Sequence, residues 1–246
     1  MSLALLSDLH ANLQALQACL RHAREHGAQS FAFLGDLVGY GADPGAVVDL
    51  VAEYAAQGAI VVQGNHDAAA GGNSRGFNDL AVESLEWTRQ ALTESQRAYL
   101  ASLPLIVHQN DMCFVHATAD APSRFAYIES NSAARQSIEA AAATYTFAGH
   151  VHEQLLYFHT QTGKTAPYHP IPASPVPAPS HRRWHAIVGS VGQPRDGNPA
   201  AAYALFNAEA EEVTFFRVAY DHHAAAARIR QAGLPESLAM RIEEGI

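Results

Sequence analysis

Gly64-Asn65-His66-Asp67 follows the short apolar stretch Ala59-Ile60-Val61-Val62. The apolar stretch is rich in β-branched residues, which predicts a buried strand. After Gln63, residues 64–67 bring an amide, an imidazole and a carboxylate to the place where that strand ends. In open α/β sheets, ligands bind at the carboxyl ends of strands. The alternative for a single Asn-His-Asp sequence is a solvated turn, so the rest of the chain decides between the two interpretations.

Two strands expected earlier in the chain also end in polar side chains. Residues 3–6 and 31–34 are apolar runs typical of buried strands. The first run is followed by Asp8 and His10, which point to the same side if the extended conformation continues. The second run is followed by Asp36. The same arrangement occurs three times, which favours a common site over three separate turns.

Helices are expected between these strands. Leucines at helical spacing predict a helix over residues 12–24, and Asp43 and Pro44 are typical N-cap and first residues of a helix that ends near Tyr54. Three successive strand–helix units imply parallel strands joined by right-handed crossovers. The polar residues at the strand ends then share one edge of a sheet, where acidic and imidazole groups together indicate a metal cluster.

Later strands supply further imidazoles. The strands expected at residues 112–115 and 145–148 lead into His116 and into Gly149-His150-Val151-His152. The two histidines of the second motif are two positions apart, so both can face one site in an extended chain. The candidate metal ligands are therefore Asp8, His10, Asp36, Asn65, His116, His150 and His152.

This ligand set indicates two divalent ions. Seven nitrogen and oxygen ligands exceed what one tetrahedral zinc ion takes, and a set without thiolate leaves Mn, Fe, Zn, Ni and Co open. Asp36 is the expected bridging carboxylate. Two ions ~3.5–4 Å apart lower the pKa of a shared water and clamp phosphoryl oxygens, which favours phosphoester hydrolysis by direct water attack. The alternative is that each residue is only a satisfied polar group at a strand end, and seven such positions disfavour it.

The remaining pattern predicts an α/β chain folded as a single domain over residues 1–246. Thr93 and Gln96 form the sequence signature of a capping box. Residues 166–181 hold six of the 12 prolines and are expected to form a polyproline-like surface loop, with a proline-rich partner motif as the alternative. Further helices are expected at residues 77–92, 94–102, 131–143, 221–231 and 235–243, and further strands at residues 105–108, 155–159, 184–188, 201–206 and 213–218.

Composition limits the possible partners. The 246 residues are 48% hydrophobic and 16% charged, with a formal net charge of -9 and a pI near 5.8. A basic face for nucleic acid or an anionic membrane is therefore not expected, whereas small phosphoester substrates are compatible because bound cations reverse the local field. We expect a cytoplasmic protein, because the sequence shows no membrane-length apolar run, no signal peptide and only two cysteines. The oligomeric state is left open.

The quoted motifs resemble those of the calcineurin-like metallophosphoesterases. Residues 35–44 and 189–197 further resemble the small bacterial and archaeal phosphodiesterase-like branch of that family. The resemblance implies an α/β fold, a four-layer αββα sandwich of two mixed β-sheets. Between residues 5 and 152, five blocks occur in the order typical of the family: Asp8-x-His10, Gly35-Asp36, Gly64-Asn65-His66-Asp67, His116 and Gly149-His150-x-His152.

The resemblance also implies roles for individual residues. His66 resembles the catalytic histidine that stabilises the transition state and protonates the leaving group, and Asp67 would orient it. The residues matching the ligands of the first ion are Asp8, His10, Asp36 and His152. The residues matching those of the second ion are Asp36, Asn65, His116 and His150.

The chain departs from the family pattern in the loop after the second strand. Gly39-Tyr40 stands where the protein Ser/Thr phosphatases and diadenosine tetraphosphate hydrolases carry Asp-Arg, whose guanidinium grips a phosphate. Arg195 is the expected substitute, with an ordinary structural arginine as the alternative. Tyr40 is expected to bind substrate, with a packed loop tyrosine as the alternative.

The expected function is hydrolysis of small or nucleotide-like phosphoesters, phosphodiesters above all, by a hydroxide that bridges two divalent ions. One alternative is a phosphomonoesterase that uses the same site. The other is a binding scaffold of this fold without catalysis, which would lack the catalytic histidine, whereas His66 is present. Substrate choice then depends on a pocket wall formed by Tyr40, Arg195 and the loops at residues 68–78 and 117–128.

Overall fold

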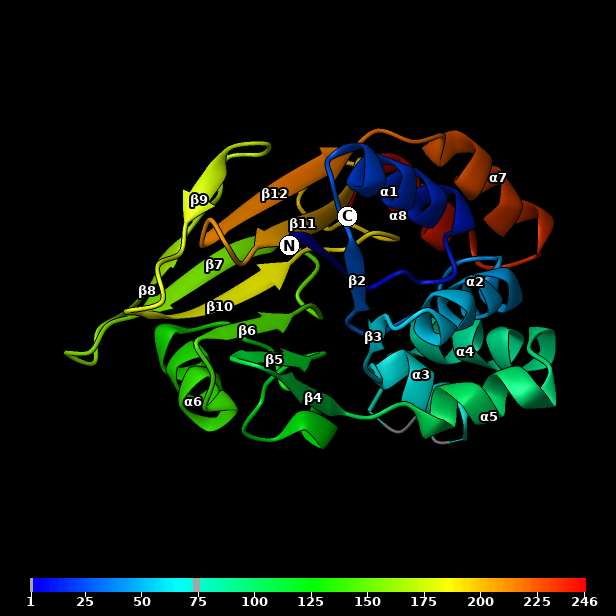
Figure 1. Ribbon diagram of the computed structural model, residues 1–246. Helices are drawn as coiled ribbons and strands as arrows, with labels where there is room; N and C mark the ends of the chain where they lie inside the picture. Colours follow the sequence, from blue (N-terminus) through cyan, green and yellow to red (C-terminus); the bar gives the residue numbers. More distant parts are fainter. Residues whose placement is uncertain (1, 73–75) are drawn as a thin grey trace.

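Two β-sheets face each other, and helices cover their outer faces (Figure 1). The computed structural model describes residues 2–72 and 76–246. The strands are β1 (Ser2–Leu6), β2 (Ser30–Phe33), β3 (Ile60–Val61), β4 (Ile106–Gln109), β5 (Met112–Val115), β6 (Tyr145–Ala148), β7 (Gln154–His159), β8 (Thr165–Tyr168), β9 (Pro175–Pro177), β10 (Arg183–Val188), β11 (Ala201–Asn207) and β12 (Glu212–Val218). The helices are α1 (Leu13–Glu25), α2 (Pro44–Ala56), α3 (Asn65–Ala70), α4 (Asp79–Ala91), α5 (Glu94–Ser102), α6 (Asn131–Ala141), α7 (His222–Gln231) and α8 (Glu236–Glu244), with one 3-10 turn at Pro122–Arg124.

Both sheets have six strands and mixed directions. The first has the order β3-β2-β1-β11-β12-β9 and the second β4-β5-β6-β10-β7-β8. β1, β2 and β3 are parallel, as the three strand–helix units predicted, while β11 pairs antiparallel with β1. In the second sheet, β5, β6 and β10 are parallel, so the polar residues that follow β5 and β6 leave the sheet at the same edge.

Alternation along each strand produces the four layers. On β1, Leu3 and Leu5 face the second sheet, whereas Ala4 and Leu6 belong to the core beneath α1 and α2. The second sheet is covered on its outer side by α6, which packs with the buried Ile187 of β10. The predicted αββα sandwich of two mixed sheets is therefore confirmed.

The proline-rich segment differs from the expected loop. Residues 166–181 include most of β8, which pairs with β7, and all of β9, which pairs with β12. Proline is tolerated there because both strands lie at sheet edges, where one row of backbone groups needs no partner. Val176 between two prolines is buried and anchors β9. The prediction of a loop without pairing is wrong for these two short strands.

The capping predictions were confirmed at one helix and altered at another. Thr93 and Gln96 form the expected capping box at the start of α5. Asp43 occupies the N-cap position of α2, but its carboxylate pairs with Arg228 at 2.7 Å instead of capping the helix. In the described ranges, every helix is too short or too polar to cross a bilayer.

Candidate metal centre

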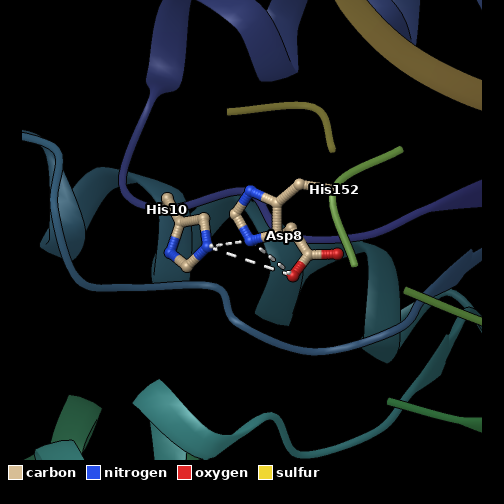
Figure 2. Close-up of side chains that lie close together, drawn as sticks. All are labelled: Asp8, His10 and His152. Carbon is tan, nitrogen blue, oxygen red and sulfur yellow. Dashed lines mark hydrogen bonds and ion pairs between the residues drawn. The ribbon is translucent and has the colours of Figure 1, made fainter. Parts of the chain in front are cut away.

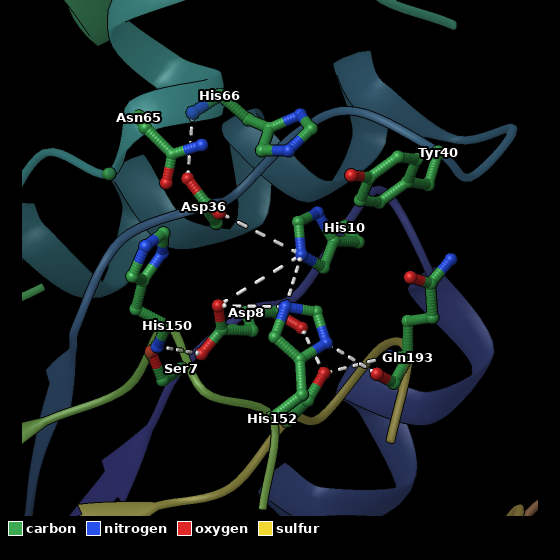
Figure 3. Close-up of polar contacts among 12 residues, drawn as sticks. Ser7, Asp8, His10, Asp36, Tyr40, Asn65, His66, His150, His152 and Gln193 are labelled. Carbon is green, nitrogen blue, oxygen red and sulfur yellow. Dashed lines mark hydrogen bonds and ion pairs between the residues drawn. The ribbon is translucent and has the colours of Figure 1, made fainter. Parts of the chain in front are cut away.

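The seven candidate ligands meet where strands of both sheets end. Figure 3 labels all of them except His116. From the first sheet, Asp8 and His10 follow β1, Asp36 follows β2, and Asn65 begins α3 just after β3. From the second sheet, His116 follows β5, and His150 and His152 follow β6. The expectation that these side chains share one rim of the fold is fulfilled in the structure.

One group of ligands consists of Asp8, His10 and His152 (Figure 2). His152 Nε2 lies 3.2 Å from Asp8 Oδ1 and 3.1 Å from His10 Nε2. His10 Nε2 and Asp8 Oδ1 are 3.9 Å apart. All three side chains are buried, so these ligand atoms face one another away from bulk water.

A second group lies beside the first and is linked to it by Asp36. His116 Nε2 is 3.4 Å from Asp36 Oδ2, 3.1 Å from His150 Nδ1 and 3.1 Å from Asn65 Oδ1. The same Asp36 Oδ2 lies 3.8 Å from His10 Nε2 of the first group. Asp36 therefore has the position that a bridging carboxylate needs.

The backbone at the ligands is not extended, in contrast to the expectation for the two alternating motifs. Asp8, His10 and Asp36 have φ of 53°, 44° and 52°, and His150 and His152 have 68° and 67°. Such left-handed values are uncommon outside glycine and cost of order 1–3 kcal/mol each, so they persist where the surrounding structure enforces them. Tight turns, and not a two-residue strand repeat, direct these side chains into the site.

Three ligand histidines have Nδ1 at a backbone carbonyl and Nε2 directed into the site. His10 Nδ1 lies 3.2 Å from Val38 O, His116 Nδ1 2.7 Å from Leu34 O and His152 Nδ1 2.5 Å from Gln193 O. A carbonyl oxygen only accepts, so each Nδ1 carries a hydrogen, and in its neutral form each ring presents a lone pair at Nε2. These lone pairs point at each other and at carboxylate oxygens.

A divalent cation resolves this arrangement. Two facing lone pairs repel, and Asp8 Oδ1 is a buried oxygen without a hydrogen-bond partner among the described residues. Histidines whose other nitrogen donates to a carbonyl are typical metal ligands. The donor set of imidazole, carboxylate and amide oxygen therefore fits divalent metal ions of the Mn, Fe, Zn, Ni or Co type.

Electrostatics within the site also favour positive charge. Burial raises the pKa of Asp36, but the neighbouring histidines, His116 foremost, together outweigh burial and hold the pKa well below its usual range. Burial lowers the pKa of His116, but the carboxylates of Asp36 and Asp8 together with the Leu34 carbonyl outweigh burial and raise the pKa to about 10. The carboxylates of the site therefore favour a bound positive charge, which a protonated histidine supplies when no metal is bound. A divalent ion would supply the same charge.

His66 stands at the edge of the ligand groups, on the first turn of α3. Its ring contacts Tyr40 and Phe77, with centroids 4.5 Å and 4.9 Å away, and it lies edge-on to His10. Its Nδ1 is buried without a hydrogen-bond partner among the described residues. Burial lowers the pKa of His66 to about 4 despite the nearby Asp36. The ring is therefore held by aromatic packing beside Asp36 and the ligands.

Asp67 has a different place from the one expected for a group that orients His66. Its carboxylate is fully buried and accepts hydrogen bonds from the backbone N–H groups of Gly64 at 2.9 Å, Leu37 at 2.8 Å and Val38 at 3.4 Å. Burial and the nearby Asp36 raise its pKa to about 7. Asp67 joins the start of α3 to the loop after β2 and contacts backbone, whereas the His66 ring contacts aromatic side chains.

A cavity of about 600 Å³ opens over the ligand groups. Tyr40 and Arg195 both line it, and the Arg195 guanidinium lies 5.9 Å from the Tyr40 ring centre. Tyr40 also packs against α7 and α8, as expected of a packed loop tyrosine, while its place in the cavity wall leaves substrate binding as a prediction. Of the expected wall at residues 68–78, the first part belongs to α3, and residues 73–75 lie outside the described residues.

Three aromatic or basic cavity residues lie within the wall segments expected from the sequence, but no sequence motif singles them out individually. Phe77, Arg124 and Tyr127 line the cavity, and Tyr127 stacks on His150. Phe77 was assigned to the start of a helix, but α4 begins two residues later, at Asp79, with Asn78 as its N-cap. The other two residues lie in the expected wall at 117–128, where only the aromatic and basic residue types point to a role in the cavity.

Comparisons with known proteins agree with this geometry. The family model for the calcineurin-like phosphoesterase superfamily domain matches residues 1–211. A metallophosphoesterase from Sphaerobacter thermophilus is 36% identical with a TM-score of 0.88, and the match covers 100% of both chains. Protein MJ0912 of Methanocaldococcus jannaschii is 29% identical over 246 residues, 98% of this chain and 96% of that protein. Hypothetical protein PH1004 from Pyrococcus horikoshii OT3 shares the fold, with a TM-score of 0.80 and 20% identity over 100% of this chain and 98% of that chain.

The fold and the buried ligand groups together define a phosphoester hydrolase with candidate sites for divalent metal ions. The two facing sheets, the strand-end ligands and the match over most of the sequence all lead to the same family. The chain belongs to the calcineurin-like phosphoesterase superfamily.

Proposed function

We propose that the protein is a dinuclear-metal phosphodiesterase that hydrolyses small or nucleotide-like phosphoesters. The observation that carries the proposal is the pair of adjacent ligand groups that share Asp36 Oδ2, at 3.8 Å from His10 and 3.4 Å from His116. The residues that would hold one ion are Asp8, His10, Asp36 and His152. Those that would hold the other are Asp36, Asn65, His116 and His150.

The chain's own residues have distinct roles in this proposal. Two divalent ions, when bound, supply Lewis-acid activation of water and neutralise charge on phosphoryl oxygens. His66 is the candidate proton donor to the leaving oxygen, because its ring lies at the open side of the ligand groups and lines the cavity. Arg195 is the candidate phosphate contact, since its hydrogen-bond and ring partners, Gln193 and Tyr40, are both neutral.

The first experiment measures metal content and hydrolysis on the same sample. Protein loaded with Mn is assayed with bis-p-nitrophenyl phosphate and with p-nitrophenyl phosphate. We expect close to two equivalents of metal and faster turnover of the diester. A preference for the monoester would replace the diesterase by a phosphatase on the same site. Bound metal with no turnover of either ester would contradict catalysis and support a binding scaffold.

The role of His66 is tested by His66→Ala. The variant keeps every proposed ligand, so we expect unchanged metal content and a loss of about 10²–10⁴-fold in turnover, the usual size of a general-acid contribution. His169→Ala, which removes an exposed histidine, is the matched control and should retain full activity. Unchanged turnover in His66→Ala would remove His66 from the mechanism, and loss of metal would make it a ligand.

A further inference from the structure

The segment from Pro122 to Tyr127 forms one wall of the cavity. It contains the 3-10 turn Pro122–Arg124 and then Phe125 in a left-handed conformation with φ of 49°. A bulky residue with positive φ is strained by roughly 1–2 kcal/mol, and such strain is typical of binding sites where the surroundings enforce it. The turn places Arg124, Phe125 and Tyr127 together on the cavity wall.

Tyr127 presents a free aromatic face beside the ligand groups. One face of its ring stacks on the His150 imidazole, with centroids 4.1 Å apart and planes inclined by 22°. The residue is nevertheless 48% exposed, whereas most large apolar side chains among the described residues are buried. An exposed tyrosine held flat by a buried histidine is a preorganised platform for a second ring, because little side-chain freedom is lost on stacking.

Arg124 supplies positive charge at the same wall. Its side chain is exposed, and within residues 2–72 and 76–246 it has no ion pair with a carboxylate. Arg195 reaches the cavity from the loop between β10 and β11 and is likewise without an acidic partner in the described ranges. Among the described residues that line the cavity, the one carboxylate is Asp36, which belongs to the ligand groups. Beyond the ligands, the charged side chains of the wall are therefore cationic.

We propose that Tyr127 stacks on the base and Arg124 contacts the phosphate-bearing side of a nucleotide phosphodiester whose scissile phosphate lies at the ligand groups. The proposal rests on the proposed phosphoesterase function and specifies its substrate class. A cavity of about 600 Å³ has room for a nucleotide. An exposed aromatic side chain binds a planar base by stacking, which does not require base-specific hydrogen bonds.

The base contact is tested with two diesters that release the same leaving group. Thymidine 5′-(p-nitrophenyl phosphate) carries a base, and methyl p-nitrophenyl phosphate does not. In the Mn-loaded wild type we expect a higher kcat/KM for the nucleoside ester. Tyr127→Leu should lower this ratio about tenfold, mainly through KM, while Tyr127→Phe retains it because the ring remains. Tyr168→Leu, which removes a tyrosine of 42% exposure on β8, is the matched control.

A purely structural role of Tyr127 gives a different result. If Tyr127 only supports His150, Tyr127→Leu lowers the metal content and the turnover of both esters by the same factor. The kcat/KM ratio then stays at its wild-type value, which would overturn the proposal. Metal analysis of each variant separates these two outcomes.

Binding measurements keep the proposal testable even without turnover. Calorimetry compares thymidine 5′-monophosphate with ribose 5-phosphate on the Mn-loaded protein. Tyr127→Leu should abolish the preference for the nucleotide, whereas Arg124→Gln should weaken both ligands severalfold and preserve the preference. Arg135→Gln, at an exposed arginine of α6, is the control for charge. If the protein binds the nucleotide in a Tyr127-dependent way but hydrolyses neither ester, only the proposed function is contradicted. If the enzyme is active but its preference for the nucleotide does not depend on Tyr127, only this inference is contradicted.

Discussion

The His66 ring occupies space that is open only because residue 39 is a glycine. A Cβ at Gly39 would lie 2.3 Å from His66 Nδ1, and the residue also has φ of +87°. Gly39→Ala must therefore displace the imidazole that is proposed to protonate the leaving group. We expect kcat/KM to fall about 100-fold with metal content unchanged, since a shift of ~1 Å in a reacting group costs this much.

A second glycine separates displacement of His66 from backbone strain. Gly58 has φ of +97°, but a Cβ there would meet no atom within 4 Å. Gly58→Ala thus carries a similar conformational cost, of order 1 kcal/mol, without touching the site. Equal activity in Gly39→Ala and Gly58→Ala would show that the position of the His66 ring is unimportant for turnover.

Individual ligands could be predicted from the sequence, but their orientation could not. Asp8, Asp36 and Asn65 follow apolar strands, and this pattern is visible in residue types alone. The left-handed backbone at Asp8 and His10, and the carbonyl groups that fix the histidine tautomers, depend on contacts between distant segments. The structure is therefore needed to show that the lone pairs face one another.

At the scale of elements, α3 and the loop after β2 are joined through Asp67. Asp67→Ala leaves three buried backbone N–H groups without an acceptor, which costs about 3 kcal/mol or more. We expect a melting temperature lower by about 10 °C and weaker metal retention, because Asp36 and Asn65 lie on the two joined segments. Calorimetry and metal analysis measure both effects.

The capping box of α5 provides the control for this prediction. Thr93→Ala removes an exposed helix cap at a cost of about 1 kcal/mol and should leave metal retention unchanged. If Asp67→Ala instead lowers only turnover, with stability and metal content of the wild type, then Asp67 acts on His66 and its structural role is refuted.

The elements that sequence patterns predicted least well are those that depend on a neighbour. The stretch Gly64-Asn65-His66-Asp67, for which a solvated turn was the alternative, is the N-cap and first turn of α3, and the buried Asp67 carboxylate stabilises this turn by accepting from Gly64 N–H. β9 is three residues long and contains two prolines, so its identity as a strand comes from pairing with β12. Longer segments such as α1 and β10 have enough periodic residues to be predicted without such partners.

At the scale of the whole molecule, a buried histidine makes stability depend on pH. His185 of β10 is fully buried, and neither ring nitrogen has a hydrogen-bond partner among the described residues. Burial lowers its pKa from 6.5 to about 3. The unfolded chain takes up this proton below pH 6.5 and the folded chain does not. The stabilising contribution is therefore complete above pH 6.5 and is lost as the pH falls toward 3.

Urea unfolding of wild type and His185→Leu from pH 7 to pH 3.5 tests this dependence. One extra proton bound by the unfolded state corresponds to a slope of about 1.4 kcal/mol per pH unit. As the pH is lowered, the free energy of unfolding should fall less steeply in His185→Leu than in the wild type, and the two slopes should differ by nearly this amount. Both proteins are measured with chelator present. Identical slopes would show that His185 binds its proton equally well in the folded state.

The architecture of the whole chain was predicted by family resemblance more than by pattern. Periodicity identified most strands, but the division into two sheets depends on which strands pair, as in the insertion of β10 between β6 and β7. The cavity wall at Arg124 and Tyr127 was located as a segment only, because surface loops carry no periodic signal. Long-range pairing and loop conformation are thus what the sequence left undetermined.

The origin of the ligands from both sheets sets the order of events during biosynthesis. A nascent chain that ends before His116 contains no ligand from the second sheet, and the proposed first ion also needs His152. β1 gains its partner β11 only after residues 201–207 have left the ribosome. The complete set of candidate ligands, on a first sheet in which β1 has its partner, therefore exists only after nearly the whole chain has been translated.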